Sequence, residues 1–339
     1  MKASLRAVRS HLPERRLTNE MLAREFGDWD SRKISEKTGI ETRAIAGEDE
    51  CASDLGIAAA AKLFDGGVVD RTQIDFLIFC TQSPDYFLPA TACLVQERLK
   101  LSTTCGAIDI NQGCSGFVYG LSLAKGLIES GTSERVLLIT AETYSKHIDP
   151  TDRSVRTIFG DGACATLIAA SPGEAESIGP FVLGTDGKGA SQLIVKAGAF
   201  RQPRACAVTA TSETTIAPTG QQLYMNGPEI MGFTLHTVPK LVADLLQKAA
   251  LRPQDVDYFI FHQANKFMLE QLQRKLKIPS EKFCINLQHY GNTVSSTIPM
   301  ALEIALREGR VLPGQRIMLV GFGVGYSWAG AMVRVEEMV

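Results

Sequence analysis

The segment Ile74-Asp75-Phe76-Leu77-Ile78-Phe79-Cys80 has a counterpart in the second half of the chain, Val256-Asp257-Tyr258-Phe259-Ile260-Phe261-His262. After an acidic residue, each copy continues as a run of apolar residues, which is the pattern of a strand buried on both faces of a sheet. The repeat predicts that the second half of the chain folds like the first.

The correspondence extends downstream of these segments. Gln112–Ser115 of the first copy occupies the place of Tyr290–Thr293 in the second, and a helix-like run and an apolar strand follow each. The predicted strands lie at 74–79, 107–110, 136–140 and 163–169 and, in the second copy, at 257–261, 283–285, 317–320 and 329–335. The predicted helices lie at 90–101, 115–130, 267–276 and 293–308. Strands that alternate with helices predict an α/β fold with parallel sheets covered by helices.

The two halves are predicted as residues 1–172 and 173–339, which meet at the turn-rich stretch Ser171–Glu174 and form one rigid body. Two segments have no counterpart in the repeat: residues 11–47, which carry mixed charge, and residues 184–223, which are rich in Gly, Thr, Ala and Ser. Long insertions on such scaffolds often line binding sites, so we expect both to lie near one.

Composition excludes several classes of function. A chain of 339 residues can hold two fused cores, and its formal net charge of −2 argues against nucleic-acid binding. The N-terminal residues lack the apolar core of a secretion signal, and no uncharged apolar run is long enough to span a membrane. The eight cysteines show neither CxxC spacing nor paired Cys/His clusters, which favours a cytoplasmic enzyme without disulfides or metal.

Cys114 lies between Gly113 and Ser115-Gly116, directly after a predicted strand and directly before a predicted helix. Small neighbours permit a sharp turn and the close approach of a substrate. The positive end of the helix dipole favours the thiolate, so we expect a thiol of lowered pKa and raised nucleophilicity. The alternative interpretation is a small buried hydrophobic residue, which is the usual role of an intracellular cysteine.

His262 ends a predicted strand, where the polar groups of parallel sheets point into a crevice, and Asn292 lies in the turn that matches the Cys114 turn. Taken singly, the histidine could be a structural hydrogen-bonding residue and the asparagine a helix cap. Together they are harder to dismiss, because the repeat brings both to one crevice opposite Cys114. A thiol, an imidazole and an amide can carry out acyl-transfer and carbanion chemistry without a metal or prosthetic group.

The loop Gly321-Phe322-Gly323-Val324-Gly325-Tyr326 follows the strand predicted at 317–320. It lacks the full dinucleotide fingerprint and the helix that should follow it, so a nucleotide cofactor is not expected. We expect its backbone N–H groups to lie beside Cys114 and to bind a thioester oxyanion. A tight hairpin before the final strand is the alternative, and the two interpretations are compatible.

These residues resemble the three active-site motifs of the β-ketoacyl-acyl-carrier-protein synthase III family: Cys114 in Gln112–Phe117, the string His262–Asn265, and Asn292 in His289–Thr293. The resemblance extends in order over almost the whole chain, to the stretches 37–40, 149–153, 159–163 and 325–328. It implies the thiolase-like fold, five layers of α-β-α-β-α built from a duplicated half, usually as a homodimer.

The family mechanism implies that Cys114 attacks an acyl thioester while the backbone N–H groups of Cys114 and Val324 bind the oxyanion. A malonyl thioester then enters, and His262 and Asn292 donate hydrogen bonds to its carbonyl as carbon dioxide departs. The product is a 3-oxoacyl thioester. The implied enzyme is an acyltransferase of fatty acid biosynthesis that acts on thioesters of coenzyme A or acyl-carrier protein and needs no bound cofactor.

Further site positions are assigned by the resemblance alone. Where the family usually has a Trp that stacks on the adenine of coenzyme A, this chain has Lys33, with Trp29 four residues earlier, while the stacking residue Arg153 is retained. Priming by coenzyme A or by a carrier protein therefore stays open.

Two more positions differ from the family pattern. Leu88 replaces a Phe that closes the acyl pocket of the partner subunit, and the smaller side chain would admit a longer or branched acyl group. Val324 replaces a Gly of the oxyanion loop. Two other residues of these motifs are assigned to the substrate site: Phe159 and Asn265.

Carrier-protein recognition in this family resembles a basic surface meeting an acidic helix. Four basic residues after the His262 motif would form such a surface here: Lys266, Arg274, Lys275 and Lys277. The alternative interpretation of these residues is a solvated helix face.

Two other functions remain open at this point. Relatives in natural-product pathways transfer the Cys-bound acyl group to an alcohol or amine, and a non-catalytic partner subunit could share the fold. The retained Asn292 favours decarboxylative condensation over acyl transfer to an alcohol or amine. The presence of Cys114, His262 and Asn292 together argues against a non-catalytic subunit. A thiolase needs a second active cysteine, and a hydroxymethylglutaryl synthase needs an acidic base, so both enzymes fit this sequence less well.

Overall fold

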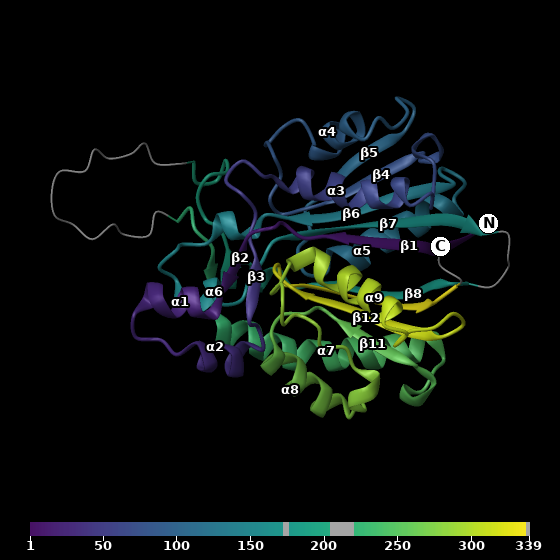
Figure 1. Ribbon diagram of the computed structural model, residues 1–339. Coiled ribbons are helices and arrows are strands. Elements are labelled where there is room, and N and C mark those ends of the chain that lie inside the picture. The colour runs from purple at the N-terminus through teal and green to yellow at the C-terminus, as the bar shows by residue number, and fades with distance from the viewer. Residues whose placement is uncertain (172–175, 204–219, 337–339) are drawn as a thin grey trace.

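Two stacked β-sheets covered by helices make up the fold in the computed structural model, which describes residues 1–171, 176–203 and 220–336 (Figure 1). The strands of the larger sheet are, in order, β1 (Lys2–His11), β7 (Gly162–Ser171), β6 (Arg135–Glu142), β4 (Phe76–Cys80) and β5 (Gly106–Ile110). Those of the smaller sheet are β11 (Tyr258–Phe261), β12 (Arg316–Gly323), β13 (Ser327–Arg334) and β8 (Ile178–Thr185). Strands β6 and β12 are buried along nearly their whole length, so each sheet must be covered on both faces.

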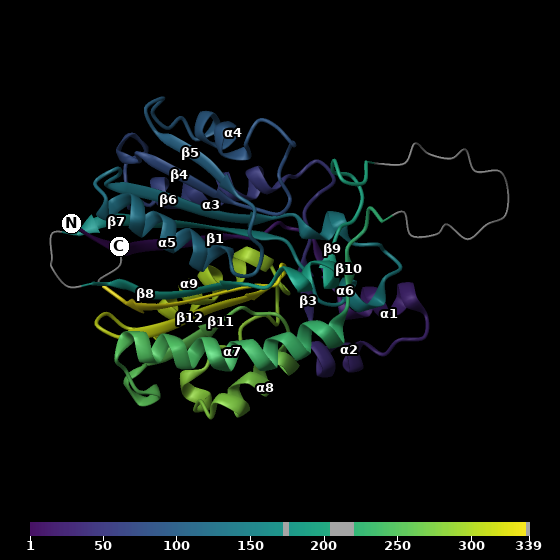
Figure 2. The ribbon, with the colours of Figure 1, turned by 180° about the vertical axis from the view of Figure 1, so that it is seen from behind.

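Three layers of helices supply this cover. The outer face of the larger sheet carries α3 (Ala52–Asp65) and α4 (Thr91–Arg98), and the outer layer of the smaller sheet consists of α7 (Gly227–Ala249) and α8 (Lys266–Leu276). Between the sheets lie α5 (Gly116–Glu129) and α9 (Thr297–Arg307), which contact both, as Figure 2 also shows. This arrangement confirms the predicted five layers, α-β-α-β-α.

The strands are only partly parallel. β4 pairs in parallel with β5 and β6, and β11 pairs in parallel with β12. The prediction of wholly parallel sheets is wrong, because β7 runs antiparallel to β6 and β1, and β13 runs antiparallel to β12 and β8. Only residues 324–326 join β12 to β13, and so short a turn can link antiparallel but not parallel strands.

Most of the predicted elements are confirmed with their ends shifted by a few residues, but the strand predicted at 283–285 is wrong. It is reduced to a single parallel bridge between Phe283 and Phe259. The side chain of Gln263 takes the place of a strand partner there, since its Nε2 donates to the carbonyl of Cys284 (3.3 Å) and its Oε1 accepts the N–H of Asn286 (2.6 Å). Helix α7, the longest element next to the smaller sheet, was not predicted.

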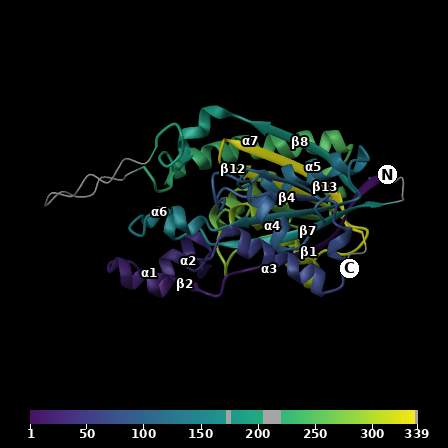
Figure 3. The same ribbon diagram turned by 90° about the horizontal axis from the view of Figure 1, so that it is seen from above.

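The two segments without a counterpart in the repeat gather at the end of the molecule away from the N-terminus, where α6 (Arg153–Arg156) also lies (Figures 1 and 3). The first segment contains the paired strands β2 (Arg16–Thr18) and β3 (Thr42–Ala44) and, between them, α1 (Asn19–Phe26) and α2 (Ser31–Thr38). The second contributes β9 (Leu193–Ile194), which pairs with β10 (Tyr224–Met225); its residues 204–219 lie outside the described residues.

The boundary predicted between residues 172 and 173 lies outside the described residues, as does most of the stretch Ser171–Glu174. Apart from the short pairs β2–β3 and β9–β10, the described strands before this boundary belong to the larger sheet. Those after it belong to the smaller sheet. The division into halves is therefore a division between sheets, although the point of division stays a prediction.

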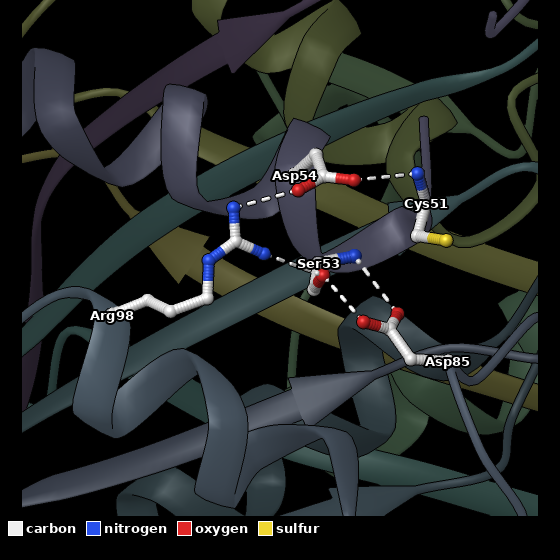
Figure 4. A network of polar contacts seen from close by, with 5 residues as sticks. All are labelled: Cys51, Ser53, Asp54, Asp85 and Arg98. Atoms are coloured by element: carbon white, nitrogen blue, oxygen red, sulfur yellow. Dashed lines mark hydrogen bonds and ion pairs between the residues drawn. The ribbon is translucent and has the colours of Figure 1, made fainter. Parts of the chain in front are cut away.

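A polar network fastens the loop after β4 to the start of α3 (Figure 4). Asp85 of this loop accepts hydrogen bonds from the hydroxyl (2.6 Å) and the backbone N–H (3.4 Å) of Ser53. Arg98 of α4 donates to the Ser53 hydroxyl (3.0 Å) and pairs with Asp54 (2.6 Å), which also accepts the N–H of Cys51 (2.7 Å). Directly after Asp85, three large side chains are exposed by 63, 77 and 79%: Tyr86, Phe87 and Leu88.

The middle layer predicts where truncation should be most costly. Leu302 of α9 is fully buried between the sheets, whereas Leu312, just beyond the same helix, is 52% exposed. Leu302→Ala should lower the free energy of unfolding by about 2–5 kcal/mol, because apolar contacts are lost and a cavity remains. Leu312→Ala is the matched control and should change it by about 0.5 kcal/mol or less. Urea denaturation followed by circular dichroism measures both, and equal losses would contradict the layer assignment.

Candidate active site

A cavity of about 1120 Å³ reaches the thiol of Cys114. Residues of both halves and of both inserted segments line it, and they include His262 and Asn292. The exposed fractions of the three residues are only 5, 2 and 3%: Cys114, His262 and Asn292. The fold therefore brings the three residues that the sequence singled out into one buried site.

Each of the three side chains is positioned by the end of a regular element. Cys114 lies in the turn between β5 and α5. His262 directly follows β11, and its N–H continues the pairing with β12 by donating to a β12 carbonyl (2.8 Å). Asn292 is tied to the first half by two backbone hydrogen bonds, one to the carbonyl of Ile158 (2.9 Å) and one from the N–H of Gly160 (3.0 Å).

The end of β12 passes directly against the turn that carries the thiol. A Cβ atom on Gly321 would lie 2.6 Å from the Cα of Ser115, and one on Gly323 would lie 2.7 Å from the Sγ of Cys114. Such short contacts exclude a side chain at either glycine. The hydroxyls of Ser115 and Ser327, 2.6 Å apart, join the same turn to β13. The backbone that follows β12 is therefore held beside the sulfur.

Burial raises the pKa of the Cys114 thiol to about 12. The backbone N–H groups of Val324 and of Cys114 itself, both directed at the sulfur, lower it by a smaller amount. The predicted thiol of lowered pKa is therefore wrong: α5 begins only at Gly116, and the loss of hydration has the larger effect. The two N–H groups nevertheless occupy the place that an oxyanion site requires.

The imidazole of His262 is neutral, because burial lowers its pKa to about 3. Its Nδ1 lies 2.8 Å from the hydroxyl of Thr297, the first residue of α9. Phe322 packs edge-on against the ring, with the ring centroids 5.6 Å apart. Since Nδ1 is engaged, Nε2 is the nitrogen that can meet a ligand in the cavity.

Asn292 begins a turn that leads through the 3-10 helix η6 (Val294–Ser296) into α9. Val294 has a φ of 53°, in the left-handed region that β-branched residues rarely adopt, and its N–H donates to the Oδ1 of Asn292 (2.9 Å). With Oδ1 engaged, the amide presents its Nδ2 donors to a ligand. The cavity thus holds a thiol, two backbone donors, an imidazole and a carboxamide, which together can stabilise negative charge on a thioester oxygen.

Comparison with known proteins agrees with this geometry. The family models for 3-oxoacyl-[acyl-carrier-protein] synthase III and for its C-terminal part match residues 108–187 and 246–335. The β-ketoacyl-[acyl-carrier-protein] synthase III 2 of Halalkalibacterium halodurans is 39% identical over 333 residues, which cover 98% of this chain and 96% of the relative. The chain belongs to the 3-oxoacyl-[acyl-carrier-protein] synthase III family.

Solved structures of this family share the fold. The structure of a 3-oxoacyl-(acyl-carrier-protein) synthase III is 52% identical, with a TM-score of 0.95 over 98% of this chain and 100% of the other. The priming β-ketosynthase of a polyketide biosynthetic pathway is 29% identical, with a TM-score of 0.88 over 100% of this chain and 97% of the other. The predicted thiolase-like α/β fold is confirmed. These relatives favour neither acyl transfer to an alcohol or amine nor a non-catalytic subunit.

At the mouth of the synthase cavity, Arg153 is held by residues of its own chain. Its guanidinium lies 5.0 Å from the ring centroid of Phe26 and 5.6 Å from that of Trp29, and it forms an ion pair with Asp28 (2.8 Å). Trp29 and Arg153 both line the cavity. Although Trp29 precedes the expected tryptophan position, Lys33, by four residues, the fold places it against Arg153.

The remaining predicted substrate residues also line the cavity, namely Lys33, Phe159 and Asn265. Asn265 has a second role, because its Oδ1 caps α8 by accepting the N–H of Met268 (2.8 Å). Lys37 lies one turn after Lys33 on α2 and lines the same mouth, although no role was assigned to it from the sequence. The two lysines place positive charge on this part of the cavity lining.

Two predicted groups lie away from the cavity. Leu88 is not part of its lining and projects into solvent. Of the four basic residues, only Lys266 lies at the cavity end of α8, beside Asn265 and Phe267 of the lining. The other three lie towards the far end of this helix, about 12–16 Å further along its axis: Arg274 and Lys275 in its last turn and Lys277 at its C-cap. The basic surface predicted from these four residues stays a prediction, and only its first member adjoins the cavity.

Sequence reasoning missed Glu142, a fully buried carboxyl group at the end of β6. It accepts hydrogen bonds from the hydroxyl of Ser295 (2.8 Å), the N–H of Gln82 (3.0 Å) and the hydroxyl of Ser83 (3.1 Å). Burial raises its pKa to about 8, although these bonds act in the opposite direction. Ser295 belongs to the turn that begins at Asn292, so Glu142 joins the two halves. The sequence did contain a signal for this residue, because Glu142 ends the apolar run of β6.

The described residues offer no obvious metal site. Among residues 1–171, 176–203 and 220–336, no three His, Cys, Asp or Glu side chains are grouped to hold a metal ion. Within the same ranges, no helix combines the length and the apolar character needed to cross a membrane. The seven cysteines in these ranges are all free thiols, and Cys206 lies outside them.

The raised pKa of Glu142 predicts a pH-dependent stability. Between pH 4.5, the ordinary value that applies to the unfolded chain, and about pH 8, the folded protein binds a proton that the unfolded chain has lost. The free energy of unfolding should therefore fall as the pH rises through this window and level off above it. Urea titrations between about pH 5 and about pH 8 measure this, and Glu142→Gln should remove that part of the slope. Parallel pH profiles for the two proteins would contradict the assignment.

Proposed function

We propose that this chain catalyses the decarboxylative condensation of an acyl thioester with a malonyl thioester of acyl-carrier protein, giving a 3-oxoacyl thioester. One observation carries the proposal: Cys114, His262 and Asn292 share a cavity in which two backbone N–H groups face the sulfur. The names of the relatives, β-ketoacyl-acyl-carrier-protein synthases, support the same reaction here. The proposal requires neither a metal ion nor a prosthetic group.

In the first half-reaction, the sulfur of Cys114 attacks the carbonyl carbon of the acyl thioester. The N–H groups of Cys114 and Val324 stabilise the oxyanion that forms. The bond to the donor thiol then breaks, and the proton of Cys114 leaves with that thiol. Because burial raises the pKa of Cys114 to about 12, we infer that the thiol is not ionised beforehand and that its proton passes to the sulfur of the donor as the new bond forms and the old one breaks.

In the second half-reaction, the malonyl thioester loses carbon dioxide, and the bonding electrons pass into its thioester carbonyl as an enolate. Asn292 donates to the enolate oxygen through Nδ2 and His262 through Nε2. The low pKa of His262 lets the imidazole do so without a positive charge. The carbanion attacks the acyl carbon, the Cys114 thiolate departs, and a proton from water restores the thiol.

The mouth of the cavity suits a thioester with an anionic carrier. Lys33 and Lys37 line it, and the side chain of Lys266 at the start of α8 is 51% exposed. Coenzyme A and the pantetheine arm of a carrier protein both carry phosphate, which these cations attract. We infer that the primer and the malonyl-carrier protein use this same entrance, and that acyl-carrier protein is the macromolecular partner.

We also infer a cytoplasmic homodimer. The exposed side chains of Phe87 and Leu88 precede α4, whose first N–H groups bind Asp109 of β5 at 2.7 Å. β5 is the edge strand of the larger sheet, and its Ile108 is 39% exposed. An open edge beside exposed apolar side chains favours association with a second copy. The free cysteines are typical of a reducing compartment.

Because acylation and condensation use different residues of the site, single substitutions should impair the two steps separately. Cys114→Ala should form neither the acyl adduct nor the product, because attack needs the sulfur. Asn292→Ala should still acquire the acyl group, while condensation falls by about 10²–10³-fold, because one donor to the enolate oxygen is lost. Intact-protein mass spectrometry reads the adduct, and labelled carbon dioxide from malonyl-acyl-carrier protein reads the condensation.

Cys93→Ala is the matched control for these variants, because Cys93 is an exposed thiol outside the cavity lining. It should retain both half-reactions. Condensation at full rate by Cys114→Ala would refute the proposal. So would a wild type that is acylated but releases no carbon dioxide, since acyl transfer to an alcohol or amine would then be the better assignment.

The exposed apolar loop predicts the oligomeric state. The wild type should sediment as a dimer at micromolar concentration, and the double variant Phe87→Asp with Leu88→Asp should shift towards the monomer, because buried charge opposes association. Met21→Asp, at a 39% exposed residue of α1, is the control and should leave the dimer intact. A monomeric wild type would overturn this inference.

A further inference from the structure

Arg43 of β3, in the first inserted segment, is a fully buried arginine. Its Nε donates to the carbonyl of Thr157 (2.9 Å), and its terminal nitrogens donate to the same carbonyl and to Oδ1 of Asn19. Burial lowers the pKa of the guanidinium to about 10, so the group keeps its positive charge near neutral pH.

The charge of Arg43 has no counter-ion in the part of the chain that the structure describes. Its acceptors there are a backbone carbonyl and a side-chain amide, which are both neutral. Taking a cation out of water without an opposite charge beside it is strongly unfavourable. An apolar side chain could fill the same space without this penalty, so packing alone does not account for a cation here.

Arg43 lies directly behind one wall of the synthase cavity. Thr157 and Ile158 line the cavity, and Arg43 binds the carbonyl that joins them. On the adjoining side, a Cβ atom on Gly291 would lie 3.1 Å from Cγ of Arg43, and Gly291 directly precedes Asn292 of the lining. Arg43 itself is not part of the lining, so its charge acts on a ligand through a single layer of wall residues.

The two proposed substrates differ in the charge that they bring to this wall. The primer carries a neutral acyl group to Cys114, whereas the malonyl group carries a carboxylate. As carbon dioxide departs, the negative charge moves to the enolate oxygen beside Asn292 and so stays near the wall that Arg43 backs. A buried cation acts strongly on such a charge, because little water lies between them to screen it.

We infer that Arg43 is a specificity-determining residue, whose unpaired positive charge behind the wall at Thr157 and Asn292 selects the anionic malonyl group for the second half-reaction. This inference rests on the proposed condensation. Arg43 touches neither substrate and acts through the potential that it creates in the cavity. Because the negative charge is attracted both before and after carbon dioxide departs, neutralising Arg43 should raise KM for malonyl-acyl-carrier protein more than it lowers kcat.

Asn19→Asp tests the charge without removing Arg43. Asn19 is buried, its Oδ1 accepts from Arg43, and its Nδ2 donates to the carbonyl of Ile40 (2.8 Å). An aspartate of nearly the same shape would place a carboxylate against the guanidinium and cancel its potential, while the bonds from Arg43 to Thr157 remain. Asn19→Ala is the matched control, because it loses the same amide without adding a charge.

Two stable phosphopantetheine analogues measure the preference. Both carry an amide in place of the thioester, and one ends in the malonyl carboxylate while the other ends in a neutral carboxamide. Titration calorimetry should show that the wild type binds the carboxylate analogue about 10-fold more tightly than the carboxamide. This ratio should fall to about twofold or less in Asn19→Asp, because the added carboxylate pairs with the cation, and should persist in Asn19→Ala.

Kinetics provide the second readout. In Asn19→Asp, KM for malonyl-acyl-carrier protein should rise about 10-fold, while kcat and the acylation of Cys114 by a neutral thioester stay within about twofold of the wild type. Arg43→Met should lose the carboxylate preference, and Arg43→Lys, which keeps a positive charge, should retain it. Lys37→Met, at the mouth, should weaken both analogues equally, because they share the same phosphate.

The outcomes separate this inference from the proposed function. A wild type that binds the two analogues equally overturns the inference, as does a folded Asn19→Asp that keeps the wild-type ratio, since Arg43 would then be only a structural tie to Thr157. If Asn19→Asp does not fold, equal ratios in Arg43→Met and Arg43→Lys overturn it. A wild type that releases no carbon dioxide from malonyl-acyl-carrier protein refutes the function, while calorimetry still decides the preference.

Discussion

The closeness of β12 to the turn at Cys114 is the constraint on which the rest of the site depends. Positions 321 and 323 admit no Cβ atom, and a Cβ on Gly113 would lie 2.5 Å from both Gln82 Oε1 and Val324 Cγ1. Glycine at these positions lets two backbones from different halves approach within contact distance. That approach directs the N–H of Val324 at a sulfur that belongs to the other sheet.

Buried polar contacts hold the two halves in this relation. Glu142 of β6 binds Ser295 of the turn before α9, and Thr140, also of β6, lies 3.0 Å from the hydroxyl of Ser296. A buried polar group that loses its partner is costly, whereas apolar surfaces can slide with little loss. These bonds therefore fix the distance between the thiol of one half and the two side-chain donors of the other more sharply than apolar packing alone would.

The entrance is built largely from segments that the repeat does not share. Lys33 and Trp29 lie in the first of these segments, and Trp29 packs on Arg153, whose charge is already paired with Asp28. Because these residues lie on α1, α2 and α6, outside the two sheets, they can differ between relatives without disturbing the catalytic core. The thiol, imidazole and carboxamide thus belong to the layered core, whereas the entrance residues lie outside it.

Local patterns in the sequence determined most of the elements, the duplicated halves and the three residues that converge on the cavity, because strand and helix periodicity and chain order are properties of neighbouring residues. Only the tertiary structure decided the antiparallel placement of β7 and β13 and the meeting of Trp29 with Arg153. It also reversed the expected pKa of Cys114 and revealed Glu142 and Thr297 as partners of the site. Burial and hydrogen bonding between residues far apart in the chain control these features, and neither can be read from residues that are adjacent in sequence.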